Sequence, residues 1–173
     1  MQRIAVIGNA GGGKSVLCRK LSQARDIPLF PIDTIQWKPG WVAAPYAEIK
    51  AQHDLVLAQQ AWILDGWGPW DLIEQRFQAA DTIIFVDLPL RVHIWWSLKR
   101  QFACIFKPRV DGPPGCPMLP VTGRLLKMIW RIHRTLRPRL VELIERQPQD
   151  KQVIYIRSPQ ELHRFIARVS SLE

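Results

Sequence analysis

The 173-residue sequence has no uncharged apolar run of the roughly 18 residues that a membrane span needs, and its N-terminus lacks a charged region followed by a long apolar stretch. It has only three cysteines, Cys18, Cys104 and Cys116, with no CxxC pair and an odd count. An odd cysteine count without a CxxC pair is typical of reduced thiols, so we expect a cytoplasmic chain. Because the apolar runs are missing, we expect neither a secretory signal nor a membrane span. The length suits one domain with one core, residues 1–173.

Metal-binding and nucleic-acid-reading patterns are also missing. A zinc site from Cys104, Cys116 and His133 is conceivable, but the spacing matches no common zinc pattern. The four histidines, at positions 53, 93, 133 and 163, are scattered, and we expect surface or packing roles for them. No helix-turn-helix, zinc-finger or RRM signature is present, which removes the common sequence-reading modules.

Acidic residues are scarce in one part of the chain. Residues 91–146 hold 12 Lys/Arg against 3 Asp/Glu, whereas the rest of the chain has 12 of each, so this segment carries the whole net charge of +9. Such a segment faces something anionic or forms a strongly solvated surface.

The most informative segment that is present is Gly8-Asn9-Ala10-Gly11-Gly12-Gly13-Lys14-Ser15. It fits the phosphate-binding Walker A template (P-loop) at Gly8, Gly13, Lys14 and Ser15. Its glycines let successive backbone N–H groups point at phosphate oxygens, Lys14 supplies a cation, and the Ser15 hydroxyl suits Mg²⁺. The helix that begins there, including Val16, presents its positive end to the same anions. The segment predicts a site for ATP and Mg²⁺.

The hydrophobic pattern around this loop alternates between strands and helices. Short apolar strands are expected at 3–7, 27–32, 61–64, 82–86 and 152–156, and helices at 15–24, 46–60, 70–78, from Pro89 through Ile105, 123–146 with a bend near Pro138, and after the capping box at Ser158. This order predicts an α/β fold: a five-stranded parallel sheet flanked by helices on both faces.

A proline- and glycine-rich stretch, residues 107–120, cannot form regular structure. A loop of this length in a compact domain is usually a lid or a binding loop. We expect the lid to span about residues 103–121.

Three carboxylates follow expected strands, at the edge of the sheet where ligands bind: Asp33, Asp65 and Asp87. Asp65 is the favoured Mg²⁺ carboxylate, together with Ser15, with a turn cap as the alternative. Asp87 is a competing metal carboxylate, but an N-cap role is favoured. Asp33 is the candidate to orient or deprotonate an acceptor hydroxyl, or else starts an Asx turn.

Two further groups of residues are candidates for the site. Guanidinium groups near the lid suit phosphate oxygens, although many surface arginines are merely solvated; the candidates are Arg100, Arg109, Arg124, Arg131, Arg134 and Arg137. Tryptophans near the second and third strand ends either shape an acceptor pocket or cover the edge of the core: Trp37, Trp41, Trp67 and Trp70.

These motifs together resemble a family. The P-loop, Asp33 with Trp37-Lys-Pro-Gly-Trp41, Trp62-Ile-Leu-Asp-Gly66, Ala80–Pro89 and Gly115-Cys-Pro117 resemble the adenylate-kinase-related P-loop proteins labelled DNA topology modulation or FlaR-like. The resemblance runs over nearly the whole chain and implies a core kinase fold of the nucleoside-monophosphate and shikimate kinase type with a lid. Adenylate kinases follow Asp-Gly with Phe-Pro-Arg, whereas here Trp67-Gly68-Pro69 follows, which argues against adenylate as acceptor.

The leading hypothesis is a phosphotransferase that uses ATP and Mg²⁺, with Lys14, Asp33, Arg100, Arg131 and Arg134 acting on the transferred phosphoryl group and its acceptor. The acceptor is a nucleotide or another small molecule, and the chain is a monomer or homodimer. Two alternatives use the basic segment: nucleotide-gated binding to nucleic acid, aided by Trp95, Trp96 and Trp130, or contact of the helix near 91–106 with an anionic membrane.

Overall fold

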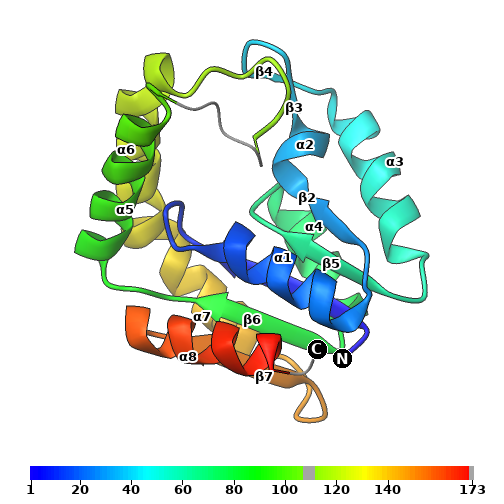
Figure 1. Ribbon diagram of the computed structural model, residues 1–173. Coiled ribbons are helices and arrows are strands. Elements are labelled where there is room, and N and C mark those ends of the chain that lie inside the picture. Colours follow the sequence, from blue (N-terminus) through cyan, green and yellow to red (C-terminus); the bar gives the residue numbers. More distant parts are fainter. Residues whose placement is uncertain (107–111, 172–173) are drawn as a thin grey trace.

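A parallel sheet of five strands forms the centre of this computed structural model, which describes residues 1–106 and 112–171. The strand order is β2 (Leu29–Pro31), β5 (Trp62–Asp65), β1 (Arg3–Gly8), β6 (Thr82–Val86) and β7 (Gln152–Ile156). The α/β fold predicted from the sequence is therefore confirmed. β1 lies in the middle and pairs with β5 and β6, so the loop after Gly8 begins at the centre of the sheet's carboxyl edge (Figure 1).

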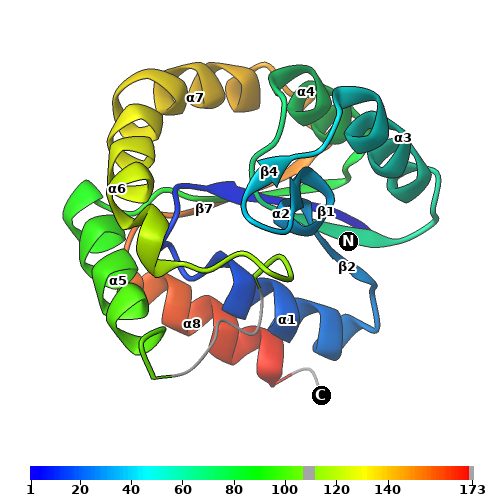
Figure 2. The ribbon, with the colours of Figure 1, turned by 90° about the horizontal axis from the view of Figure 1, so that it is seen from above.

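Helices cover both faces of the sheet, which explains why its strands are almost continuously apolar. On one face lie α1 (Lys14–Arg25) and α8 (Pro159–Ser170), and on the other lie α3 (Tyr46–Leu57), α4 (Trp70–Ala79) and α7 (Arg137–Glu145) (Figure 2). Leu17, Leu21 and Leu162 pack under the first layer. Ile73, Phe77 and Leu140 pack under the second.

The basic helix expected over 123–146 is interrupted earlier than predicted. α6 (Thr122–Arg131), which follows a 3₁₀ turn at Leu119–Val121, leads into a π-helical turn at Ile132–Leu136 and then into α7. Pro138 lies in the first turn of α7, directly after this π turn. The wider π turn changes the angular position of Arg134 relative to Arg131 from the position it would have in a straight α-helix.

α5 (Leu90–Ala103) forms as predicted, but its buried side is polar. His93, Ser97 and Gln101 face inward, while Leu98 and Phe102 are exposed. α5 and α6 lie side by side at one end of the sheet (Figures 1 and 2). None of the helices in the described ranges is long and apolar enough to cross a bilayer.

The strand–helix pattern missed a short helix and a hairpin after β2. α2 (Ile32–Gln36) carries Asp33 in its first turn, and β3 (Trp37–Lys38) pairs antiparallel with β4 (Val42–Ala43). Residues 115–118, from the second half of the expected lid, contact this hairpin. Within that lid, residues 107–111, which include Arg109, fall outside the described residues.

Candidate nucleotide and acceptor site

The loop between β1 and α1 is packed so tightly that its glycines have no room for a side chain. A Cβ on Gly8 would lie 2.2 Å from Val86 O, because β6 runs directly alongside. Gly11 has φ +69°, and a Cβ there would lie 2.3 Å from Ser97 Oγ and 2.5 Å from His93 O, both on α5. The loop backbone is thus fixed between β6 and α5, with its N–H groups at the start of α1.

Lys14 folds back over the loop, and its Nζ donates a hydrogen bond to Asn9 O at 2.9 Å. Burial lowers the pKa of the Lys14 ammonium, while the negative charges of Asp65 and Asp33 oppose the shift and the positive charge of Arg100 adds to it. The structure therefore brings four predicted site residues, Lys14, Asp33, Asp65 and Arg100, within electrostatic reach of one another.

Ser15 and Asp65, the predicted metal pair, are in direct contact. Ser15 Oγ donates to Asp65 Oδ2 at 3.0 Å, and Asp65 is only 7% exposed at the end of β5. A hydroxyl and a carboxylate beside a phosphate loop are the oxygen donors that Mg²⁺ takes, so these residues fit the ion. Among the described residues, no cluster of three or more His, Cys, Asp or Glu is arranged for a metal, so the zinc site considered for Cys104, Cys116 and His133 is not formed.

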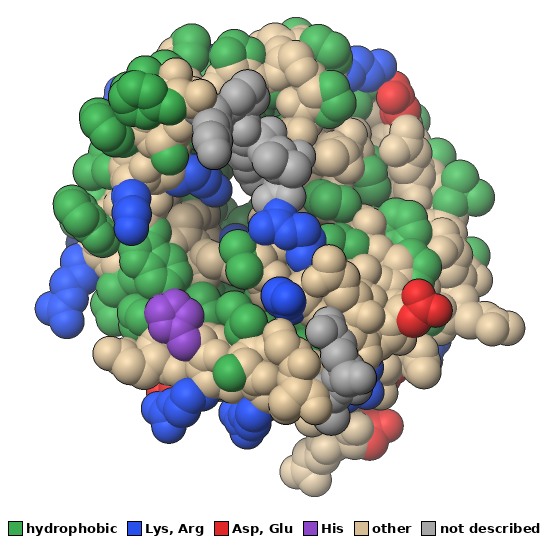
Figure 3. Space-filling view, viewed as in Figure 1, with side chains coloured by type: hydrophobic (Ala, Val, Ile, Leu, Met, Phe, Trp, Pro, Cys, Tyr) green, Lys and Arg blue, Asp and Glu red, His purple; other side chains and the backbone are tan. Residues whose placement is uncertain are grey.

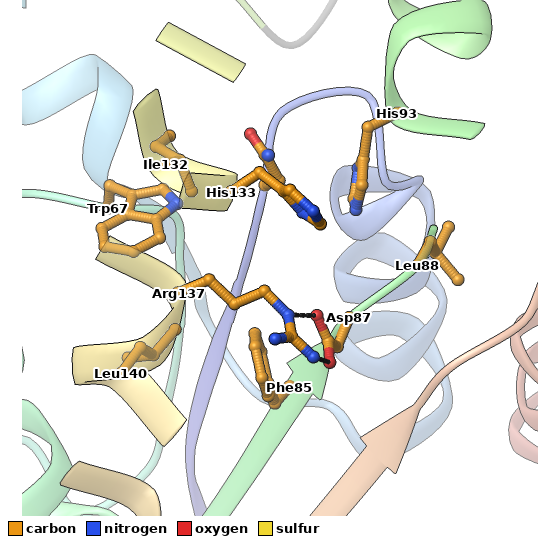
Figure 4. A pocket seen from close by; sticks show the side chains of 10 residues that line it. Trp67, Phe85, Asp87, Leu88, His93, Ile132, His133, Arg137 and Leu140 are labelled. Carbon is orange, nitrogen blue, oxygen red and sulfur yellow. Dashed lines mark hydrogen bonds and ion pairs between the residues drawn. The ribbon is translucent and has the colours of Figure 1, made fainter. Parts of the chain in front are cut away.

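The prediction that Asp87 caps α5 is wrong: Pro89 occupies the N-cap position, and no side chain caps the helix. Arg137 instead binds the Asp87 carboxylate with both ends of its guanidinium: Nε lies 2.6 Å from Oδ1, and a terminal nitrogen lies 2.6 Å from Oδ2 (Figure 4). This pairing raises the pKa of Arg137. Arg137 thus links the end of β6 to the start of α7, and its guanidinium is already engaged by the Asp87 carboxylate.

His93, expected to have only a packing or surface role, supports the P-loop directly. Its Nδ1 lies 3.0 Å from Ala10 O. Since a carbonyl oxygen only accepts, Nδ1 carries the proton. Burial, with a further contribution from the Lys14 charge, lowers the pKa of His93 to about 4, so the ring is neutral at pH 7. In Figure 4 the rings of His93 and His133 reach into a small pocket behind the loop.

Two other residues hold the edges of the site: Trp67, one of the tryptophans predicted from the sequence, and Arg76, which carries no sequence signal. Trp67 Nε1 donates to Gly8 O at 2.8 Å, which links the loop after β5 to the first residue of the motif. Arg76, fully buried on α4, donates to Gly66 O at 2.8 Å and to Trp67 O at 3.2 Å. Burial lowers its pKa to about 10, and the nearby Asp65 charge opposes that shift.

Two of the four tryptophans expected near the acceptor contact each other, and the other two have different partners. Trp37 and Trp41 of the β3–β4 hairpin meet edge to face with ring centroids 5.8 Å apart. Trp70 lies under Arg139, whose guanidinium carbon is 4.5 Å from the ring centroid. All four of these tryptophans, including Trp67, are partly buried, so each both covers the core edge and presents some surface.

The hairpin also contacts the described part of the expected lid. Gly40 N donates to Gly115 O at 2.9 Å, Trp41 Nε1 to Pro117 O at 2.8 Å, and Cys116 Sγ to Lys38 O at 3.3 Å. These bonds join two segments about which the strand–helix pattern is silent. The two bonded segments lie above the start of α1 (Figure 1). Figure 3 shows a hollow there with Lys and Arg side chains at its edge.

The remaining predicted arginines are placed differently from Arg100. Arg124, Arg131 and Arg134 have exposed side chains on α6 and the π turn. Arg134 lies over Trp130, with its guanidinium carbon 5.6 Å from the ring centroid. A role for Arg131 and Arg134 on phosphate stays a prediction.

Comparison with known proteins places this geometry in a structural class. No protein-family model matches the chain, and no curated protein sequence is significantly similar to it. Solved structures are similar: shikimate kinase from Bacteroides thetaiotaomicron (TM-score 0.57, 14% identity, 99% of this chain and 97% of that one) and shikimate kinase from Acinetobacter baumannii in complex with shikimate (0.56, 15%, 99% and 92%). A gluconokinase from Sinorhizobium meliloti is also similar (0.54, 13%, 99% and 90%).

The fold is therefore that of the small P-loop kinases, an α/β sheet with a phosphate loop after its central strand. At these identities the likeness establishes the fold alone. The sequence-based resemblance is supported at this coarser level, that of a P-loop fold related to adenylate kinase.

Proposed function

We propose that this chain is a phosphotransferase that moves the γ-phosphoryl group of ATP, in the presence of Mg²⁺, to a hydroxyl group of a nucleotide or other small molecule. The observation that carries the proposal is the meeting of Lys14, Asp33 and the Ser15–Asp65 pair at one edge of the sheet. A phosphate loop alone serves motors and switches as well as kinases. A second carboxylate beside the lysine is what a transfer to an acceptor hydroxyl requires.

Each residue has a defined part in this proposal. The backbone of residues 8–16 cradles the phosphates, and Lys14 leaves Asn9 O to bind their outer oxygens. Ser15 and Asp65 would hold Mg²⁺, which when bound neutralises charge on the phosphate oxygens. Asp33 accepts a hydrogen bond from the acceptor hydroxyl and orients its oxygen toward the phosphorus. Arg100 contributes positive charge near the transferred group.

The segment 103–121 acts as the lid in this proposal. The bonds from its described part to Lys38, Gly40 and Trp41 support this, because the same hairpin follows α2, which carries Asp33. A lid that docks on the acceptor side excludes water and so favours transfer to the acceptor over hydrolysis.

The test is ATP binding and turnover in Lys14→Ala, compared with Lys20→Ala, which removes a lysine from the same helix outside the motif. We expect Lys14→Ala to lower turnover by about a thousandfold, the effect typical of losing a preorganised charge at a developing anion. The midpoint of its urea unfolding should stay the same. Turnover equal to that of Lys20→Ala would contradict the proposal.

A further inference from the structure

The outward side of α5 exposes large apolar side chains that the described part of the chain does not cover. Trp95 is 66% exposed and Phe102 65%, and Phe106, just past the helix end, is 74% exposed. Soluble monomers rarely expose such neighbouring residues without a partner. We call this surface the α5 face; it consists of Arg91, Trp95, Leu98, Lys99, Phe102 and Phe106.

Helical geometry makes the α5 face continuous. Its members, apart from the adjacent Leu98 and Lys99, follow one another at intervals of three or four residues, and they lie opposite the buried His93, Ser97 and Gln101. The rings of Phe102 and Phe106 meet edge to face with centroids 5.8 Å apart. From Arg91 to Phe102 the stripe extends about 17 Å, at the rise of an α-helix. His93 and Ser97 pack against the P-loop and Gln101 donates to Met118 O, so α5 cannot rotate to bury its aromatic side.

The charge around the α5 face is of one sign. Arg91 and Lys99 are exposed within it, and the described residues between Leu88 and Glu142 include no Asp or Glu. In Figure 3 the surface over α5 and α6 shows green and blue side chains and no red ones. A partner that matches this face therefore combines an apolar layer with negative charge.

We propose that the α5 face docks on an anionic phospholipid surface. Trp and Phe side chains would enter the boundary between headgroups and acyl chains, while Arg91 and Lys99 contact lipid phosphates. A second copy of the chain fits less well, because pairing two such faces brings like charges together. Single-stranded nucleic acid prefers a groove that follows its backbone, whereas this face is a convex helix that also carries Leu98.

The experiment is co-sedimentation of the full chain with vesicles of phosphatidylcholine alone or mixed with phosphatidylglycerol. The test variant is Trp95→Ser/Phe102→Ser. Its matched control is Val42→Ser/Leu55→Ser, which removes residues that are 59% and 70% exposed elsewhere on the surface. A second variant, Arg91→Gln/Lys99→Gln, removes the charges. Urea unfolding of each variant verifies that it folds.

We expect pelleting with the mixed vesicles that weakens as salt rises, and little with phosphatidylcholine alone. The aromatic variant should bind at least about tenfold more weakly, given the transfer free energies of Trp and Phe. The charge variant should lose the salt dependence, and the control variant should bind like the unaltered protein.

Several outcomes would overturn the proposal. One is no pelleting with mixed vesicles even at low salt, and another is equal pelleting by the test and control variants. A dimer in sedimentation that the aromatic variant abolishes would assign the face to a second copy. Binding of single-stranded DNA without vesicle binding, abolished by the same variant, would assign it to nucleic acid.

Discussion

A methyl group added to Gly11 tests whether the P-loop is held against α5 as the structure describes. In Gly11→Ala the new Cβ would lie 2.3 Å from Ser97 Oγ and 2.5 Å from His93 O, at φ +69°. The left-handed backbone costs about 1–2 kcal/mol for an L-residue, and overpacking a tight contact adds about 1–3 kcal/mol. Because His93 O is backbone, rotating a side chain relieves only part of the contact.

The control is Gly40→Ala, since Gly40 also has a positive φ, +77°, but a Cβ there meets no atom within 4 Å. Urea unfolding should show a loss of about 1 kcal/mol for Gly40→Ala and about 2–5 kcal/mol for Gly11→Ala. Calorimetry with a non-hydrolysable ATP analogue should show that only Gly11→Ala loses most of its affinity, because the loop must shift. Adding Ser97→Ala should restore part of the stability.

Equal losses in the two glycine variants, in both stability and affinity, would refute the reasoning. Full recovery of stability in Gly11→Ala/Ser97→Ala would also refute the reasoning, because the contact with His93 O would then contribute nothing to the loss.

Three further predictions follow from the site. The pKa of His93 is lowered to about 4, against about 6.5 in the unfolded chain, so its contribution to stability is full above pH 6.5 and falls by about 3 kcal/mol as pH drops to 4. His93→Gln should remove this contribution from a urea-unfolding pH profile and leave that of the similarly shifted His53, whereas His163→Gln, at an exposed position, should leave the profile unchanged. Arg137→Met leaves the largely buried Asp87 carboxylate without its bidentate partner. The free energy of unfolding should fall by about 1–2 kcal/mol, a value reduced for the exposure of the arginine, and adding Asp87→Asn should recover part of it in the same assay. No coupling in that double-mutant cycle would contradict the role of the ion pair. Trp41→Phe removes the hydrogen bond to Pro117 O and should raise the rate of limited proteolysis near Pro117 about fivefold. The control is Trp37→Phe; a similar rise in that variant would mean that loss of the bond is not the cause.

The sheet and the phosphate loop could be predicted from local sequence because their signals are local. The β-branched run before Gly8 needs no distant partner to read as a buried strand, and the glycines of the motif have a backbone reason to be there. The capping role of Ser158 is likewise local, and the structure shows it accepting from Glu161 N at 3.2 Å.

The residues that shape the rest of the site depend on contacts between distant parts of the chain. The partner of Asp87 lies 50 residues away at Arg137, so a strand-end aspartate followed by Leu-Pro looked like a helix cap. The buried side of α5 is polar because Gly11 packs against Ser97 and the backbone of His93, and the His93 ring lies against Ala10 O. Nothing in the sequence marks which side of such a helix meets a glycine loop.

The Asp65–Ser15 contact separates metal-assisted transfer from simple nucleotide binding. Asp65→Asn keeps the size of the side chain but removes the charge that would hold Mg²⁺. We expect its turnover to need a much higher Mg²⁺ concentration, while binding of ATP without metal changes little. An unchanged Mg²⁺ dependence would remove Asp65 from the metal site.

The central claim is transfer of a phosphoryl group to an acceptor hydroxyl positioned by Asp33. The most direct measurement is a screen of γ-labelled ATP with a panel of nucleosides, nucleotides, sugars and other hydroxylated metabolites, run in parallel with the unaltered protein, Asp33→Asn and Lys14→Ala. The account predicts a labelled acceptor product with the unaltered protein, and its loss in both variants, while Asp33→Asn still binds ATP. Label that appears only as inorganic phosphate across the panel, at equal rates with and without Asp33, would contradict it.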